Sequence, residues 1–184
     1  MLFRSARGQK LAQKLAETVK DACTAEVALT WDAVIELRLA GGSRSLDILK
    51  DAPAKLSNCP TAEERGPKGL LRLAEAQLVI GDPRLALENA KKAEKALESS
   101  PRGQAEAALL QGEAALLLPD VDTADAALKR ASSLYAQLSV PEARAKVALA
   151  NARLLLLQEA PDKALLLLQG LQGEMEKAED DPGL

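Results

Sequence analysis

Small residues recur along this chain at fixed distances from one another. Within the stretch GDPRLALENAKKA, Ala86 has a small residue twelve positions before it and another seven positions after it. Three further stretches repeat this spacing, except that a leucine takes the last position of the fourth set. The four sets are Ala33, Ser45 and Ala52; Ala74, Ala86 and Ala93; Gly112, Ala124 and Ala131; and Ala152, Ala164 and Leu171. Their first members lie 41, 38 and 40 residues apart, so the chain repeats with a period of about 40 residues.

Helical hairpins account for this spacing. Two antiparallel helices joined by a short turn bring their backbones close together only where one presents Ala or Gly to the other, so small residues must recur at fixed distances from the turn. We expect Ala86 to face Ala74 within its own hairpin and Ala93 to face the next hairpin. Proline, which is tolerated at the first position of a helix, precedes the runs rich in Ala and Leu. These prolines are Pro67, Pro83, Pro101, Pro141 and Pro161.

The composition favours helices over strands. Alanine and leucine dominate the 47% of residues that are hydrophobic, and β-branched residues are scarce beyond the first third of the chain. A chain of 184 residues is long enough to bury a core. We therefore predict an all-α protein whose repeat domain, residues 25–178, holds about four antiparallel hairpins. The hairpins span residues 25–57, 67–98, 101–138 and 141–178, and an acidic, flexible tail follows at 179–184.

Residues 1–24 form a separate basic segment with two interpretations. The first 16 residues carry four basic residues and no acidic one, a composition typical of a mitochondrial presequence. Alternatively, the segment is a basic first helix with Leu11 and Leu15 on one face. Cys23 and Cys59 lack the close pairing or the histidines of a zinc site and are interpreted as ordinary thiols of a reducing compartment. We expect an intracellular protein, cytoplasmic in the second interpretation and mitochondrial in the first.

The sequence offers no familiar catalytic chemistry. It contains no histidine, which removes the commonest general base and the commonest zinc ligand. The pair Glu63 and Glu64 lies in a linker and the acids at 174–181 lie near the end, where nothing holds the geometry of a metal or acid–base site. Asp122 is interpreted as a helix N-cap. We predict a non-enzymatic protein with no catalytic residue, no cofactor and no metal.

Charge and hydropathy argue against two classes of partner. A net charge of −3 disfavours binding to a phosphate backbone, and the three aromatic residues cannot form a stacking platform for single strands. No apolar run approaches the roughly 18 residues that a membrane-spanning helix needs. We expect neither nucleic-acid binding nor a transmembrane segment.

The repeat resembles the tetratricopeptide repeat (TPR) over roughly residues 25–175. Gly81, Asp82 and Ala86 match that family's turn and second helix, and Gly112 matches the glycine of its first helix. The chain departs from the family in placing Ala or Leu at the aromatic positions and in exceeding the usual period of about 34 residues. The resemblance implies a divergent TPR-like α-solenoid, a right-handed superhelical array of hairpins that binds other proteins.

The first helix of each hairpin in such an array lines a concave groove, and the residue after each small anchor should point into it. The groove residues predicted in this way are Val34, Glu75, Glu113 and Arg153, with Leu78, Leu116 and Leu156 one turn further on. Two acids and one base in an apolar setting favour a basic or amphipathic helix or peptide as the partner. The Lys, Asn and Arg set with which some relatives grip chaperone tails is absent. In the alternative interpretation these residues are merely exposed surface.

The last hairpin is unusually apolar for the end of an array. A terminal repeat normally turns a polar face to water, yet leucines surround much of each helix in RLLLLQ and ALLLLQGL. We expect a protein partner or a second copy to pack on Leu165, Leu166 and Leu168. In the alternative, the basic N-terminal helix or local packing covers them.

These features point to two functional classes. The first is a protein–protein interaction scaffold or assembly subunit of a larger intracellular complex. The second is a soluble adaptor or co-chaperone that binds a peptide or helix transiently in its concave groove. The uncovered apolar end favours the first class.

Overall fold

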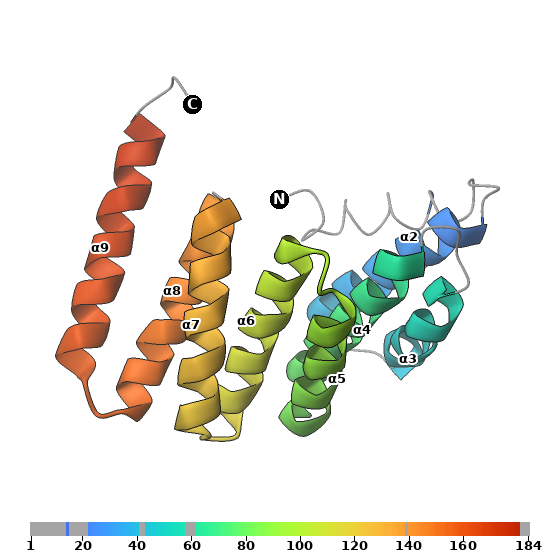
Figure 1. Ribbon diagram of the computed structural model, residues 1–184, viewed down its shortest axis with the longest axis horizontal. Helices are drawn as coiled ribbons and strands as arrows, with labels where there is room; N and C mark the ends of the chain where they lie inside the picture. The colour runs from blue at the N-terminus through green and yellow to red at the C-terminus, as the bar shows by residue number, and fades with distance from the viewer. Residues whose placement is uncertain (1–13, 15–21, 41–42, 58–61, 139, 181–184) are drawn as a thin grey trace.

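The computed structural model describes residue 14 and residues 22–40, 43–57, 62–138 and 140–180. This part of the chain is helical and contains no strand, so the predicted all-α class is confirmed for it (Figure 1). The helices are α2 (Ala22–Ala40), α3 (Ser43–Ser57), α4 (Ala62–Val79), α5 (Pro83–Ala96), α6 (Pro101–Leu117), α7 (Val121–Leu138), α8 (Pro141–Leu157) and α9 (Pro161–Asp180). Most of the basic N-terminal segment and the last four residues of the acidic tail lie outside the described residues.

Consecutive helices form four antiparallel hairpins, as the repeat of small residues predicts. α2 packs on α3, α4 on α5, α6 on α7 and α8 on α9. Their bounds match the expected ones within a few residues, except at the start of the second hairpin. There α4 begins at Ala62, and Pro67 lies inside the helix instead of opening it. The helix continues through the proline because its ring removes a single backbone hydrogen bond close to the helix start.

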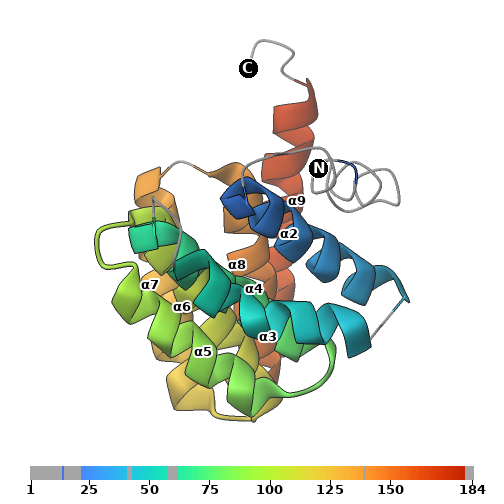
Figure 2. The same cartoon turned by 90° about the vertical axis from the view of Figure 1, so that its right-hand side faces the viewer.

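The hairpins stack into a row that bends toward one side. On that side α2 contacts α4, α4 contacts α6 and α6 contacts α8. On the opposite side, α3, α5, α7 and α9 do not contact one another within the described residues. The side formed by α2, α4, α6 and α8 is therefore the inner side of the bend. Figure 2 views the row from its N-terminal end, with the hairpins stacked behind one another.

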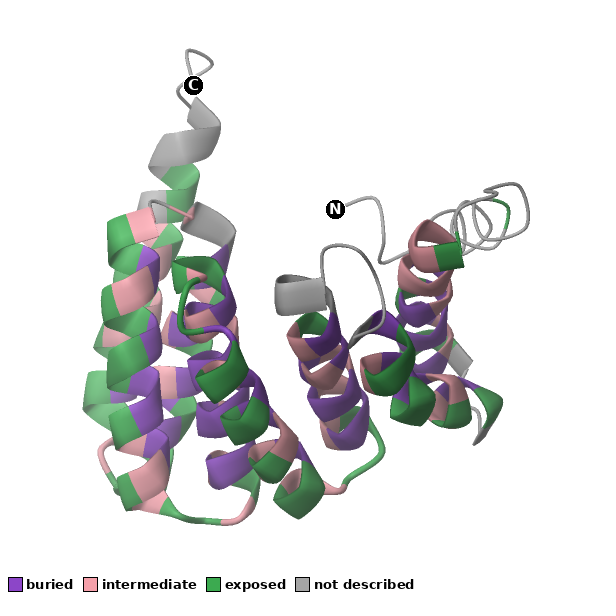
Figure 3. Cartoon of the chain, turned by 45° about the vertical axis from the view of Figure 1, so that its right-hand side comes forward, coloured by how far each residue is buried: buried purple, intermediate pink, exposed green. Residues whose placement is uncertain are grey.

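The recurring small residues lie at the contacts between helices. All nine members of the first three sets are buried, whereas Leu171 of the fourth set is only half-buried. Buried positions face neighbouring helices along the row and exposed positions face outward (Figure 3). Gly112 shows why size matters here, because a Cβ atom on it would lie 2.5 Å from Cδ2 of the fully buried Leu128 in α7. Ala93 belongs to a core cluster shared with α6, as expected for a residue that faces the next hairpin.

The turns that close the last three hairpins share one geometry. In each, a backbone N–H after the helix donates a hydrogen bond of 2.8 to 3.0 Å to a carbonyl five residues back. These bonds run from Asp82 to Gln77, from Asp120 to Ala115 and from Ala160 to Leu155. They are typical of the Schellman motif, in which the preceding residue takes a positive φ. Gly81 does so without strain at +82°, whereas Glu159 at +58° carries a Cβ atom that disfavours this conformation.

Side-chain caps begin α5, α6 and α7, whereas the start of α8 has none, and one cap differs from the prediction. Proline occupies the first position of α5, α6, α8 and α9. Oγ of Ser100 accepts a hydrogen bond from the N–H of Gly103 at the start of α6. At the start of α7 the cap is Asp120, whose Oδ1 accepts a hydrogen bond from the N–H of Thr123 at 3.1 Å. The prediction that Asp122 is the N-cap was wrong, because this residue already lies in the first turn of the helix.

Two further expectations concern the cellular environment. Cys23 is disulfide-bonded rather than an ordinary thiol, so the cysteines no longer argue for a reducing compartment. Cys59 lies outside the described residues. Within the described part of the chain, no helix combines the length and the apolar character needed to cross a membrane.

Candidate functional site

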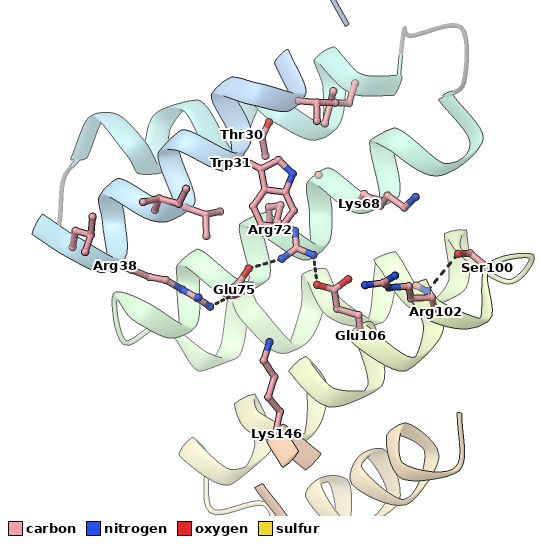
Figure 4. Close-up of a pocket in the computed structure, with 17 residues that line it drawn as sticks. Thr30, Trp31, Arg38, Lys68, Arg72, Glu75, Ser100, Arg102, Glu106 and Lys146 are labelled. Atoms are coloured by element: carbon pink, nitrogen blue, oxygen red, sulfur yellow. Dashed lines mark hydrogen bonds and ion pairs between the residues drawn. The ribbon is translucent and has the colours of Figure 1, made fainter. Parts of the chain in front are cut away.

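A cavity of about 840 Å³ opens on the inner side of the bend (Figure 4). Its lining comes mainly from α2, α4, α6 and α8, with Leu56 of α3 and Ser100 just before α6. Residues of all four hairpins therefore meet at one site, to which α2 contributes seven residues and the fourth hairpin only Lys146. Stacked helical repeats produce such a shared surface because they set equivalent helix faces side by side.

The wall that α2 contributes is largely apolar. Val27, Val34, Ile35 and Leu39 line it together with Trp31. Trp31 is the only tryptophan of the chain, and it is 37% exposed. An apolar group that entered the cavity would find both aliphatic and aromatic surface on this wall.

Four charged residues form one network within the cavity lining. Arg72 of α4 donates hydrogen bonds to Glu75 of the same helix, with Nη1 2.6 Å from Oε2, and to Glu106 of α6. Glu75 also accepts a hydrogen bond from Arg38 of α2. The guanidinium carbon of Arg72 lies 4.7 Å from the ring centroid of Trp31, a stabilising cation–π distance. The network thus links α2, α4 and α6.

The charge of Arg72 is held in place by its partners. Burial disfavours the charged guanidinium, but Glu106 and Glu75 more than offset this, so the pKa of Arg72 lies above its ordinary value. Truncating either glutamate would leave a buried charge with one partner fewer, which is costly. The arginine is therefore a fixed part of the site.

The cavity lining carries more positive than negative charge. It holds two acidic residues, both bound to Arg72, and five basic ones. The basic residues are Arg38, Lys68, Arg72, Arg102 and Lys146. Arg102 and Lys146 form no salt bridge with any residue that the structure describes. The cavity therefore differs in charge from the expected groove of two acids and one base, and the basic partner expected from the sequence stays a prediction.

The predicted groove residues all lie on the expected helices, but only two of the seven line the cavity. These are Val34, which is buried, and Glu75. Leu78 and Leu116 instead pack against core clusters. Leu156 is 57% exposed and lies outside the cavity lining.

Glu113 and Arg153 lie close to the cavity without lining it. Burial raises the pKa of Glu113, Lys146 opposes this shift, Glu75 adds to it and Arg153 opposes it. The carboxyl group of Glu113 therefore interacts electrostatically with Lys146 and Glu75, both of which line the cavity. Both residues were predicted to point into the groove, and they lie near the cavity without lining it.

Several lining residues were not anticipated, although the sequence contains their signal. Trp31 and Arg72 stand three residues before two of the predicted positions, and Glu106 and Lys146 stand seven before the other two. Residues three, four and seven apart share a helix face, and side chains lean toward the N-terminus of their helix. The groove residues were predicted after each small anchor, toward the C-terminus of its helix. The cavity lining continues instead toward the N-terminus of each helix.

A second exposed surface lies at the C-terminal end of the row. Leu165 and Leu166 of α9 are 56% and 69% exposed, and Leu168 is half-buried. We call these three residues the leucine patch. Among the described helices α9 contacts only α8, so its other faces have no helix against them. The basic N-terminal helix that was the alternative cover lies mostly outside the described residues.

The arrangement is suited to binding. Among the described residues no group of three or more Asp, Glu, Cys or His side chains could hold a metal ion. Both acids of the lining accept hydrogen bonds from Arg72. The lining presents to a ligand an apolar wall on α2 and two cations, Arg102 and Lys146, that form no salt bridge with the described residues.

Comparison with known proteins places the chain in no family, since no family model matches it and no curated protein matches it significantly. The repeat, the cavity and the leucine patch are therefore the features from which a function is inferred.

Proposed function

We propose that this protein is a non-enzymatic protein–protein interaction scaffold, an assembly subunit of a larger intracellular complex. The observation that carries the proposal is the cavity, because four hairpins build it together on the inner side of the row. Arrays of stacked repeats use such extended concave surfaces to bind other proteins.

The repeat architecture that accompanies this proposal is TPR-like, with the hairpins in a right-handed superhelical array. The period of about 40 residues and the small residues buried at each helix contact support it. Contacts between successive first helices, without matching contacts between the second helices, also support a curved array. The array is a divergent one because alanine or leucine fills the positions that aromatic residues occupy in that family.

The leucine patch supports the assembly role. Exposed apolar surface at the end of an array is costly to leave in water, and contiguous apolar patches often mark protein interfaces. Leu149, Leu157 and Met175 of the same hairpin are also between 44% and 53% exposed. A permanent partner or a second copy that covered α9 would remove this surface from water.

A second candidate function is a soluble adaptor that holds a peptide or helix transiently in the cavity. Arg102 and Lys146 favour it. Neither forms a salt bridge in the described chain, so each can bind an acidic group of a ligand without breaking one. The two candidates differ in the surface that is essential, the leucine patch for the scaffold and the cavity for the adaptor.

Native purification with chemical cross-linking and mass spectrometry tests both candidates. The scaffold predicts stoichiometric partners cross-linked near Lys163 and lost in the Leu165→Glu/Leu166→Glu variant. A control variant, Ile80→Glu/Leu85→Glu, changes two exposed apolar residues of the second hairpin and should keep the partners.

The adaptor instead predicts substoichiometric clients cross-linked at Lys68 or Lys146 and retained by the patch variant. A chain that purifies without any cross-linked protein contradicts both candidates.

A further inference from the structure

We infer that the cavity takes an acidic segment of a partner protein, in which carboxylates flank a bulky apolar side chain. The inference rests on the proposed function, because it presupposes that the cavity binds protein. It names the chemistry of the partner.

The charge balance inside the cavity carries the first step. Arg38, Arg72, Glu75 and Glu106 form a network with two charges of each sign, so the network is neutral as a whole. Two further basic residues of the lining, Arg102 and Lys146, form no salt bridge with any residue that the structure describes. A carboxylate therefore meets net attraction at this site and an ammonium group meets net repulsion.

The positions of the cations carry the second step. Figure 4 shows Lys146 of α8 pointing toward Glu75 and Glu106, and Arg102 of α6 lying beside Glu106. Carboxylates held by these two residues would leave the ligand's apolar group to pack on the apolar wall of α2. Apolar burial then supplies affinity while the cations select the ligand by its charge.

Glu113 sets a boundary on where the partner's carboxylates can lie. Burial and Glu75 raise its pKa, whereas Lys146 lowers it without a salt bridge between the two side chains. A partner carboxylate that approached Lys146 from the side of Glu113 would meet like charge.

A nucleic acid fits these observations less well than a protein segment. A phosphate backbone needs cations in succession, whereas three acids, Glu75, Glu106 and Glu113, lie among the cations here. Single strands also need several aromatic platforms, and the lining holds only Trp31. The net charge of −3 adds a general repulsion of polyanions.

Selection of random 16-residue peptides displayed on phage, against the full chain, tests the inference. We expect the enriched peptides to combine an excess of Asp and Glu with an aromatic residue or leucine. Binding of individual peptides is then measured by fluorescence anisotropy. The Arg102→Glu/Lys146→Glu variant should weaken an enriched peptide at least tenfold, and replacing that peptide's acids by lysine should restore part of the loss.

The matched control, Lys92→Glu/Lys129→Glu, makes the same charge change at exposed positions of α5 and α7 outside the cavity lining. It should leave the affinity within about twofold, and circular dichroism should show equal helix content in all variants. Neutral or basic enriched peptides, equal losses in variant and control, or no enrichment would each overturn the inference. So would an oligonucleotide of 16 nucleotides that binds more tightly than the peptides and displaces them.

Failure here is separable from failure of the proposed function. Partners that remain cross-linked in the native purification would keep the scaffold or adaptor function, even if the selected peptides were not acidic. A chain that purifies alone would remove the proposed function whatever the peptides showed.

Discussion

The third and fourth hairpins follow the same plan but use their apolar residues differently. In the third hairpin, Gly112 of α6 lets α7 approach closely, and Leu128 of α7 is fully buried in the contact. In the fourth hairpin, Leu165 and Leu166 of α9 are more than half exposed. No residue of α9 belongs to a core cluster of the described chain.

The position of a hairpin in the row explains this difference better than its composition does. Ala131 of α7 lies in a core cluster with residues of α8, the first helix of the next hairpin. Leu171 holds the equivalent place in α9, where no later hairpin follows within the described residues. A small residue is needed only where another helix must come close. The leucine is thus consistent with a surface that a different chain covers.

The largest expected difference in stability lies between truncating a buried leucine of the third hairpin and truncating an exposed leucine of the fourth. Leu128→Ala should lower the free energy of unfolding by about 2–5 kcal/mol, because it empties a fully buried site. Leu166→Ala should change it by less than about 0.5 kcal/mol, since the side chain is 69% exposed. Urea denaturation of the purified chain measures both. A large loss from Leu166→Ala would mean that α9 is buried within the isolated chain.

A pair of glycine substitutions sharpens the same comparison. Gly112→Val should destabilise the chain by about 1–3 kcal/mol, because even its Cβ atom would overlap Leu128. Gly170→Val in α9 meets nothing within 4 Å and replaces a poor helix former, so stability should stay level or rise slightly. Thermal unfolding followed by circular dichroism compares the two. Equal effects would show that α6 and α7 do not depend on close approach.

A third prediction concerns the turn of the fourth hairpin. Glu159→Gly should raise the free energy of unfolding by about 1 kcal/mol, because glycine adopts the positive φ of this position without strain. The control is Gln158→Gly at the preceding C-cap, where φ is negative and glycine brings only added entropy to the unfolded chain. Stabilisation by both changes, or by neither, would contradict this description of the turn.

The smallest expected effect is a change in pH dependence at the junction between the two hairpins. Burial raises the pKa of Glu113 above its ordinary value of 4.5, so the folded chain holds this proton more tightly than the unfolded chain. The resulting stability is complete below pH 4.5 and is lost as the pH rises through the raised pKa. Glu113→Gln should therefore stabilise the chain more at pH 7 than at pH 4.

The control for this change is Glu98→Gln at an exposed position. Denaturation midpoints of wild type and both variants, measured at several pH values, provide the test. If the denaturation midpoints of wild type and Glu113→Gln change in parallel with pH, burial does not disfavour the charged form of Glu113.

The sequence predicted the hairpins well because their determinants are local. Proline at helix starts and small residues at fixed distances from each turn act within a few residues of the feature that they specify. Pro67 was misplaced because a helix can extend past a proline near its start, and Asp122 because the turn ends two residues earlier. These errors move a boundary and leave the order of elements unchanged.

The cavity was predicted less completely because it depends on distances between hairpins. The small anchors identify which helices face inward, and that was sufficient to find Val34 and Glu75. The pairing of Arg72 with Glu106, which lie 34 residues apart, depends on how α4 and α6 pack. The contact of Glu75 with Arg38, 37 residues away, likewise depends on how α2 and α4 pack, so the sequence shows the acid without its partner.

Amide hydrogen exchange of α9, in the purified chain and in the native complex, tests most directly whether a partner completes the last hairpin. We expect rapid exchange of α9 in the isolated chain, at least tenfold slower exchange in the complex, and slow exchange of α6 in both. If α9 is as protected as α6 in the isolated chain, or unchanged in the complex, the leucine patch is not an assembly surface.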